Sequence, residues 1–147
     1  MPELVRSVAS RVRVYFKNRR QSPRLRVRLV FTIGLHRSTN GNGSNRWSQS
    51  LKGHTRDISA NGLALLVPQV HLHGHHLAAE GRELDLRLEL GGDPITMIVV
   101  PNRYEHLDTA ELGCNYLIGA RIVSIDKADR QRYLSFMREG LELNSAK

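Results

Sequence analysis

The sequence predicts an all-β protein, a six-stranded antiparallel β-barrel followed by one C-terminal helix. From Leu25 onward the dominant period of the apolar residues is two, which is typical of half-buried strands. Six or so short strands of this kind follow one another without intervening helices, and that order favours a closed antiparallel barrel. Downstream of these strands, a helical pattern begins after Asp126. We expect this helix to cover one opening of the barrel.

The first expected strands surround a polar loop. One strand places apolar side chains on alternate positions, at Val27, Leu29, Phe31 and Ile33. A glycine-rich loop at residues 38–45 follows it. Two further strands are expected at residues 47–59 and 63–67, broken at Asn61-Gly62.

The second half of the barrel begins after Gly81. One face of the next strand carries leucines, at positions 84, 86, 88 and 90. A turn at residues 91–94 leads into a strand at 95–100, and the last strand is expected at 116–125. A short helix then begins with Asp126 as its N-cap, and its apolar stripe is expected to consist of Tyr133, Leu134 and Met137.

Composition and charge divide the chain into three segments: a basic segment at 1–17, a barrel with its preceding tail at 18–126, and a helix and tail at 127–147. Residues 3–17 fit an amphipathic helix, although positions 12, 14 and 16 also alternate as in a strand. The net charge of +8 lies entirely within residues 1–28, which contain nine basic side chains and one acidic side chain. We therefore expect an anionic partner, or a membrane surface, to bind near this end.

The chain has 147 residues, 40% of them hydrophobic and 24% charged, which is the balance of a soluble globular domain. No apolar run approaches the roughly 20 residues that span a bilayer, and arginines interrupt any signal-peptide core. We expect a cytoplasmic protein without a transmembrane segment. The single cysteine, Cys114, excludes an internal disulfide and is expected to be a small core residue.

Two short polar motifs carry the functional prediction. The first is an R-x-x-x-R pattern formed by Arg20 and Arg24, with Arg19 directly before it. The second is a D-x-S-x-x-G pattern formed by Asp57, Ser59 and Gly62. Either motif alone is weak, because arginines in a basic tail are usually solvated and D-x-S often caps a turn. Their order, and the barrel pattern downstream, make the pair specific.

With these motifs the sequence resembles the PilZ family over roughly residues 18–137. The resemblance includes Gly-Leu-Ala-Leu-Leu at 62–66, the strand at 116–122 and the closing helix; the long linker between the motifs departs from it. It implies a bacterial receptor that binds cyclic di-GMP through both motifs and signals to an unidentified partner protein. The implied ligand-binding residues are Arg20, Arg24, Asp57, Ser59 and Gly62, and Arg103 is a candidate for a further contact.

The residue types suit this ligand, a dianion with two guanines. An arginine can bind a phosphate or a guanine edge with two hydrogen bonds, or stack on the purine. Asp57 can accept from the guanine N1–H and amine, and Gly62 allows close backbone approach or a positive φ. Arg19 adds a third guanidinium that could stack on an outer guanine face. This favours two ligand molecules bound as an intercalated dimer.

Other functions are less well supported. No paired carboxylates, Ser–His arrangement or phosphate-binding loop indicates an enzyme or a cofactor. His71, His73, His75 and His76 lack partner cysteines, so we expect a polar surface segment rather than a metal site. One alternative is a PilZ-like interaction module that acts without ligand. The other is a nucleic-acid-binding barrel, against which stand the neutral barrel and an aromatic content of 5%.

Overall fold

The computed structural model describes residues 23–36 and 50–145. Its elements, in chain order, are β1 (Leu25–Arg26), β2 (Val30–Leu35), β3 (Leu51–Ser59), β4 (Gly62–Val67), β5 (His71–Leu72), β6 (His75–His76), β7 (Leu84–Leu88), β8 (Ile95–Glu111), β9 (Cys114–Ile125) and α2 (Lys127–Ser145). The expected amphipathic helix at 3–17, the loop at 38–45 and the start of the strand at 47–59 lie outside the described residues. Among the residues described, no helix is both long and apolar enough to cross a bilayer.

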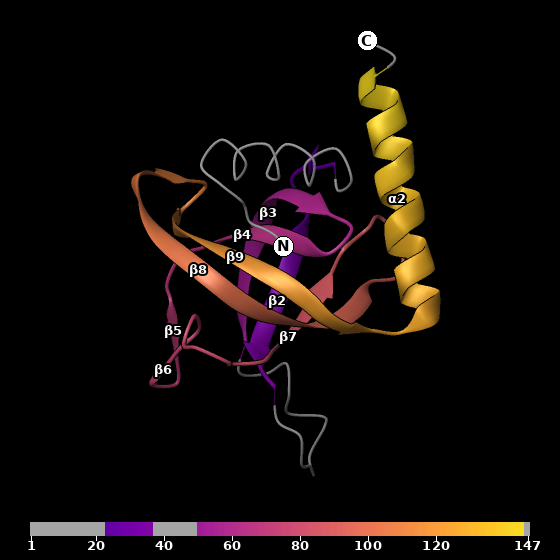
Figure 1. The fold of residues 1–147 in the computed structure, drawn as a ribbon. Helices are drawn as coiled ribbons and strands as arrows, with labels where there is room; N and C mark the ends of the chain where they lie inside the picture. The colour runs from indigo at the N-terminus through magenta and orange to yellow at the C-terminus, as the bar shows by residue number, and fades with distance from the viewer. Residues whose placement is uncertain (1–22, 37–49, 146–147) are drawn as a thin grey trace, which may run out of the picture.

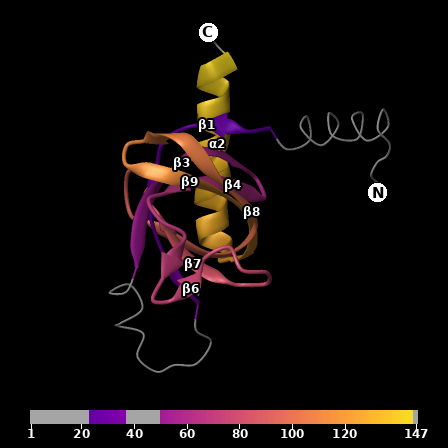
Figure 2. The same cartoon turned by 90° about the vertical axis from the view of Figure 1, so that its left-hand side faces the viewer.

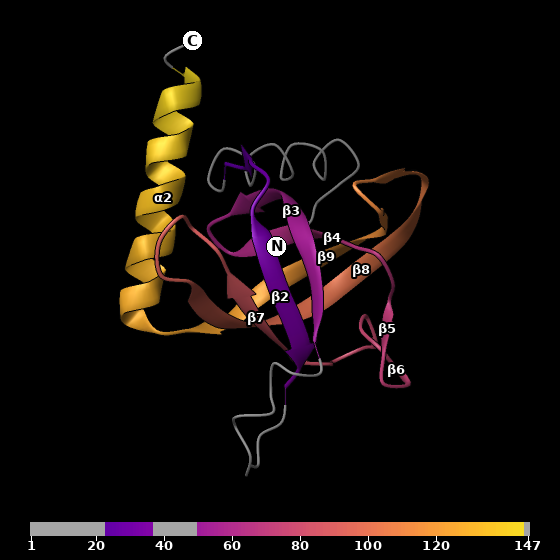
Figure 3. The ribbon, with the colours of Figure 1, turned by 180° about the vertical axis from the view of Figure 1, so that it is seen from behind.

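Six strands form a closed antiparallel barrel, as the sequence predicted (Figure 1). Around the barrel the order is β3, β2, β7, β8, β9 and β4, and β4 pairs back with β3 to close it. The short strand β1 pairs with β3 as well, beyond the end of β2. Seen from behind, β2 and β3 cross the rear wall next to β7 (Figure 3).

A bulge divides the first expected strand into β1 and β2. Between the pairs Arg26↔Asp57 and Val30↔His54, the first strand contains one residue more than β3. The buried hydroxyl of Thr55 fills the gap, because it donates to the Val27 carbonyl at 2.6 Å and accepts from the Leu29 amide at 2.9 Å. The alternating apolar residues of the first expected strand therefore do not form one continuous ladder of hydrogen bonds with β3.

The barrel interior is filled by the apolar residues that alternate along its strands. The predicted leucine face of β7 is confirmed, since Leu84, Leu86 and Leu88 are fully buried. The other walls contribute Phe31, Ile33, Ile58, Leu63, Leu65, Val67, Ile95, Met97, Val99, Ile118 and Ala120. Such side chains dominate the stability of a domain of this size because each removes a large apolar surface from water.

The β8–β9 hairpin extends well beyond the barrel wall and covers part of its outer face. The strand expected at 95–100 continues to Glu111, although its second half is polar and mostly exposed. Pairing with β9, rather than a buried face, holds that half extended, so its sequence shows no alternation. Near the hairpin tip a second apolar cluster covers the outer face of β4; it consists of Ala64, Leu66, Cys114 and Leu117.

Helix α2 lies along one side of the barrel, and its C-terminal end projects beyond it (Figure 1). The Asp126 carboxylate accepts from the Asp129 amide at 3.4 Å, as expected for the N-cap. Of the expected apolar stripe, Tyr133 and Met137 are buried, whereas Leu134 is 36% exposed. The helix has 19 residues and is longer than expected, because it continues past the barrel to pack on β1. Figure 2 shows β1 beside the helix.

The histidine-rich segment forms a small hairpin, β5–β6, at the end of the barrel away from the projecting end of α2 (Figures 1 and 3). His71 and His76 face each other across it, with ring centroids 4.9 Å apart, and His76 packs on Tyr104 at 4.8 Å. His73 and Gly74 form the turn, both with positive φ. Within the described ranges no group of three or more side chains that could hold a metal ion is found.

Candidate functional site

The second motif lies on the outer face of the barrel. Asp57 is paired with Ala64, which belongs to the outer apolar cluster, whereas Ile58 is paired with Leu63 of the interior. Because side chains alternate along a strand, Asp57 and Ser59 share the outer face, and the D-x-S spacing produces this arrangement. Both residues are nevertheless largely buried by their neighbours.

The two motifs meet at an ion pair. Nη1 of Arg24 donates to Oδ1 of Asp57 at 2.5 Å, although the residues are 33 positions apart in the chain. The bulge in β3 places Arg56 beside the same carboxylate, with Nε 3.6 Å from Oδ2. Asp57 thus balances two guanidinium groups. No motif in the sequence includes Arg56, and the irregular register of β3 brings it to the carboxylate.

The turn between β3 and β4 completes the second motif. Oγ of Ser59 donates to the Gly62 carbonyl at 3.3 Å, so the serine closes the turn. Gly62 does not have a positive φ, which excludes one of its two expected roles. A Cβ on Gly62 would lie 2.7 Å from the Ala120 carbonyl oxygen of β9. The glycine is therefore required by close approach of two backbones.

Tyr133 connects this turn to helix α2. Its hydroxyl donates to the Ser59 carbonyl at 2.6 Å, with the Gly62 carbonyl 3.3 Å away. Burial raises the pKa of Tyr133 well above its ordinary value, so the hydroxyl stays protonated and can donate at neutral pH. The sequence identified Tyr133 only as an apolar helix residue. No pattern in the sequence connects it with a turn 74 positions earlier.

Tyr133→Phe is expected to lower the free energy of unfolding by about 1–2 kcal/mol, because the buried Ser59 carbonyl would lose its strongest donor. Urea unfolding followed by circular dichroism measures the change. Tyr104→Phe, at a tyrosine that is 49% exposed, is the matched control and should leave stability unchanged. Equal effects of the two substitutions would show that the Tyr133 hydroxyl has no such role.

Arg103 lies on the same outer face as Asp57. Strand register places Asp57, Ala64, Gly119 and Arg103 in one row across β3, β4, β9 and β8. The middle of the row is occupied by Ala64 and Gly119, which have a small side chain and none. The Arg103 side chain lies over Gly119. Its guanidinium is exposed and 3.7 Å from Glu105. A row of four strands spans roughly 14 Å, so Arg103 lies on the same face as Asp57 but three strands away.

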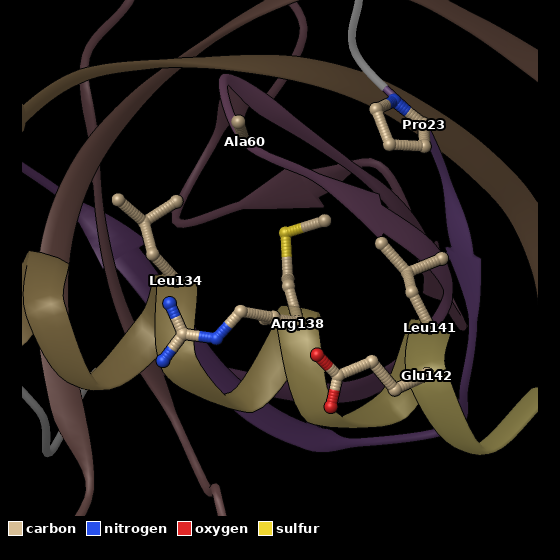
Figure 4. A pocket seen from close by; sticks show the side chains of 7 residues that line it. Pro23, Ala60, Leu134, Arg138, Leu141 and Glu142 are labelled. Atoms are coloured by element: carbon tan, nitrogen blue, oxygen red, sulfur yellow. The ribbon is translucent and has the colours of Figure 1, made fainter. Parts of the chain in front are cut away.

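A groove separates the second motif from helix α2 (Figure 4). Ala60 of the turn and Pro23 of the tail form one wall, and the helix forms the other with Leu134, Met137, Arg138, Leu141 and Glu142. Its volume is about 310 Å³ and its lining is mainly apolar. The tail that carries the first motif therefore enters the barrel at this groove. Arg19 and Arg20 lie outside the described residues, so their expected places at the site stay predictions.

These features define a class: a small antiparallel barrel closed by a C-terminal helix, with a polar site on its outer face where a preceding tail meets a strand. The chain belongs to the PilZ domain family, whose sequence model matches residues 18–142. This confirms the resemblance seen in the motifs. A search of curated proteins finds no match.

Several solved structures share the fold. The inhibitor of motility MotI/DgrA of Bacillus subtilis is 20% identical, with a TM-score of 0.58 over 84% of this chain and 52% of its own. The MrkH–c-di-GMP complex of K. pneumonia is 21% identical, with a TM-score of 0.61 over 88% and 54%. The PilZ domain of YcgR from Escherichia coli, solved with c-di-GMP, is 12% identical, with a TM-score of 0.56 over 86% and 98%. This chain thus spans about half the length of MotI and MrkH.

Proposed function

We propose that the protein is a cytoplasmic receptor for cyclic di-GMP that has no catalytic role and signals to a partner protein. The observation that carries this proposal is the contact between Arg24 and Asp57, which unites two motifs from distant parts of the chain on one outer face. Membership of the PilZ family and the c-di-GMP in the YcgR structure support it. The ligand-binding residues in the proposal are Arg19, Arg20, Arg24, Asp57, Ser59 and Gly62, with Arg103 as an additional contact.

The geometry suits both halves of the ligand. The Arg24 guanidinium is about half exposed, with 57% of its side chain accessible, so it can turn from Asp57 to a phosphate or a guanine edge. The Asp57 carboxylate then accepts from the guanine N1–H and amine, while Arg56 continues to balance its charge. Ligand binding thereby replaces an internal ion pair and changes the conformation of the tail.

Isothermal titration of the full chain with cyclic di-GMP tests the proposal. We expect saturable binding that requires guanine, because adenine lacks the adjacent N1–H and 2-amino donors that would face the Asp57 carboxylate. Cyclic di-AMP is the control for the base, and GMP is the control for the cyclic dinucleotide. Failure to bind cyclic di-GMP would leave the alternative of a PilZ interaction module that acts without ligand.

We expect two ligand molecules per chain, bound as an intercalated dimer whose outer guanine stacks on Arg19. Calorimetric stoichiometry should then fall from two to one in Arg19→Leu, because leucine removes the cation that favours stacking. Arg6→Leu, which removes an equal charge outside the motif, is the control. A ratio of one in the wild-type protein would limit Arg19 to attracting the dianion.

The tail should gain protection on binding. Backbone amides at residues 19–26 are expected to exchange more slowly with ligand bound, because the motif arginines then hold the tail to the barrel. Amides at 38–45, remote from both motifs in the sequence, should be unaffected. Hydrogen exchange followed by mass spectrometry measures both segments. Equal exchange of residues 19–26 in the two states would exclude a change in the tail.

A further inference from the structure

A second pocket lies on the outer wall of the barrel, next to the candidate site but distinct from it. It has a volume of about 490 Å³, and its walls include Arg26, Arg28, Arg56, Leu66, Glu111 and Leu112. Three separate parts of the chain meet there: the tail around β1, the β3–β4 wall and the tip of the β8–β9 hairpin. The pocket adjoins the candidate site because Arg26 is paired with Asp57 and Arg56 contacts its carboxylate.

The pocket is strongly cationic. Three guanidinium groups face one carboxylate, that of Glu111. Arg56 shares Asp57 with Arg24, whereas within residues 23–36 and 50–145 no ion pair is found for Arg26 or Arg28. The positive charge also reaches a neighbour, because Arg28 adds to burial in lowering the pKa of His54. An anionic group therefore complements the positive charge of this surface.

The tip of the β8–β9 hairpin carries an apolar side chain, Leu112, that is not part of the buried core. Leu112 and Gly113 form a two-residue turn between the paired residues Glu111 and Cys114, and both have positive φ, 51° and 82°. Such turns strongly favour Asn-Gly or Gly-Gly, because a leucine at positive φ is sterically disfavoured. Leu112 is nevertheless 69% exposed, so burial does not compensate the strain. Leu112 thus places a strained, exposed apolar side chain at the rim of the cationic pocket, where it is open to a partner.

We propose that this pocket binds an acidic segment of a partner protein. Carboxylates of the segment bind Arg26, Arg28 and Arg56, and an apolar side chain beside them packs on Leu112. A free phosphate fits less well, since it gains nothing from the exposed Leu112 side chain. The binding itself is independent of the proposed function; only its place in cyclic di-GMP signalling rests on that function.

The test uses the full-length chain and a fluorescein-labelled dodecapeptide in which glutamates and leucines alternate. A peptide with glutamine at each glutamate is the charge control. We expect the acidic peptide to bind at least tenfold more tightly by fluorescence anisotropy, and its binding to weaken as salt is added. Amide chemical shifts should change at Arg28 and Leu112.

Two variants separate binding from folding. Leu112→Asn should weaken peptide binding at least fivefold while keeping or raising the thermal midpoint, because asparagine suits the turn. Arg28→Gln, on an exposed side chain, should weaken binding to a similar extent. Equal affinity of both variants and the wild type, no binding by the wild type, or displacement of the peptide by equimolar inorganic phosphate would overturn the proposal.

Titration of the same variants with cyclic di-GMP distinguishes the two proposals. Neither Arg28 nor Leu112 belongs to the ligand-binding set, so both variants should bind cyclic di-GMP as the wild type does. If the wild type binds the acidic peptide but not cyclic di-GMP, the proposed receptor function is wrong and the proposal for the pocket is supported. If it binds cyclic di-GMP but not the peptide, only the proposal for the pocket is wrong.

Discussion

Asp57→Ala is expected to weaken cyclic di-GMP binding by about 30-fold, which corresponds to about 2 kcal/mol. The carboxylate is the acceptor for guanine in the proposed complex, and it lies on a wall where water has little access. Its loss leaves the guanine donors without a charged partner. Isothermal titration of the variant and the wild type gives the ratio of affinities.

Arg24→Ala should cost a similar amount, about 2 kcal/mol, because it removes the guanidinium that the ligand recruits. The control for Asp57→Ala is Asp108→Ala, which also removes one carboxylate. Asp108 is exposed on the distal half of β8, away from the motifs in the sequence. The effects of Arg24 and Asp57 should not add, because the residues contact each other in the free protein. Wild-type affinity in the double alanine variant would show that the site has been placed wrongly.

Gly62→Ala is expected to lower the free energy of unfolding by about 2–3 kcal/mol and to abolish ligand binding. The new methyl group would lie 2.7 Å from the Ala120 carbonyl oxygen, so β4 and β9 must separate at the motif. Separation would also displace Ser59, whose hydroxyl bonds to the Gly62 carbonyl. Thermal unfolding measures the loss, which corresponds to roughly 5–10 °C in the midpoint.

Gly92→Ala is the matched control for this substitution. Its Cβ would meet only the end of the Arg132 side chain, at 3.8 Å, and its backbone conformation suits alanine. Both the midpoint and ligand binding should therefore stay close to the wild-type values. A Gly62→Ala protein as stable as Gly92→Ala would mean that the motif glycine is not needed for the approach of the two strands.

Much of the fold could be predicted because its strands bury one face. The leucines of β7 and the N-cap at Asp126 follow rules that act over a few residues, and the structure confirms both. The distal half of β8 could not be predicted in this way. Its residues are extended because β9 pairs with them, and pairing between strands leaves no periodic trace when neither face is buried.

The candidate site was predictable to the extent that its residues belong to motifs. Asp57 and Ser59 were assigned because they match the D-x-S-x-x-G pattern. Arg56 and Tyr133 were not, because a bulge brings the first to the carboxylate and a long-range bond brings the second to the turn. Both depend on tertiary structure, and a window of a few residues does not contain that information.

The bond between Tyr133 and the β3–β4 turn makes helix α2 a lever. The helix continues 12 residues beyond Tyr133 to Ser145, a length of about 18 Å at 1.5 Å per residue. A tilt of about 10° at the tyrosine would move the far end by roughly 3 Å, and β1 would move with it because Gly140 packs against Leu25. Such a tilt would carry a small displacement at the candidate site to the tail at β1 and, enlarged, to the projecting end of α2.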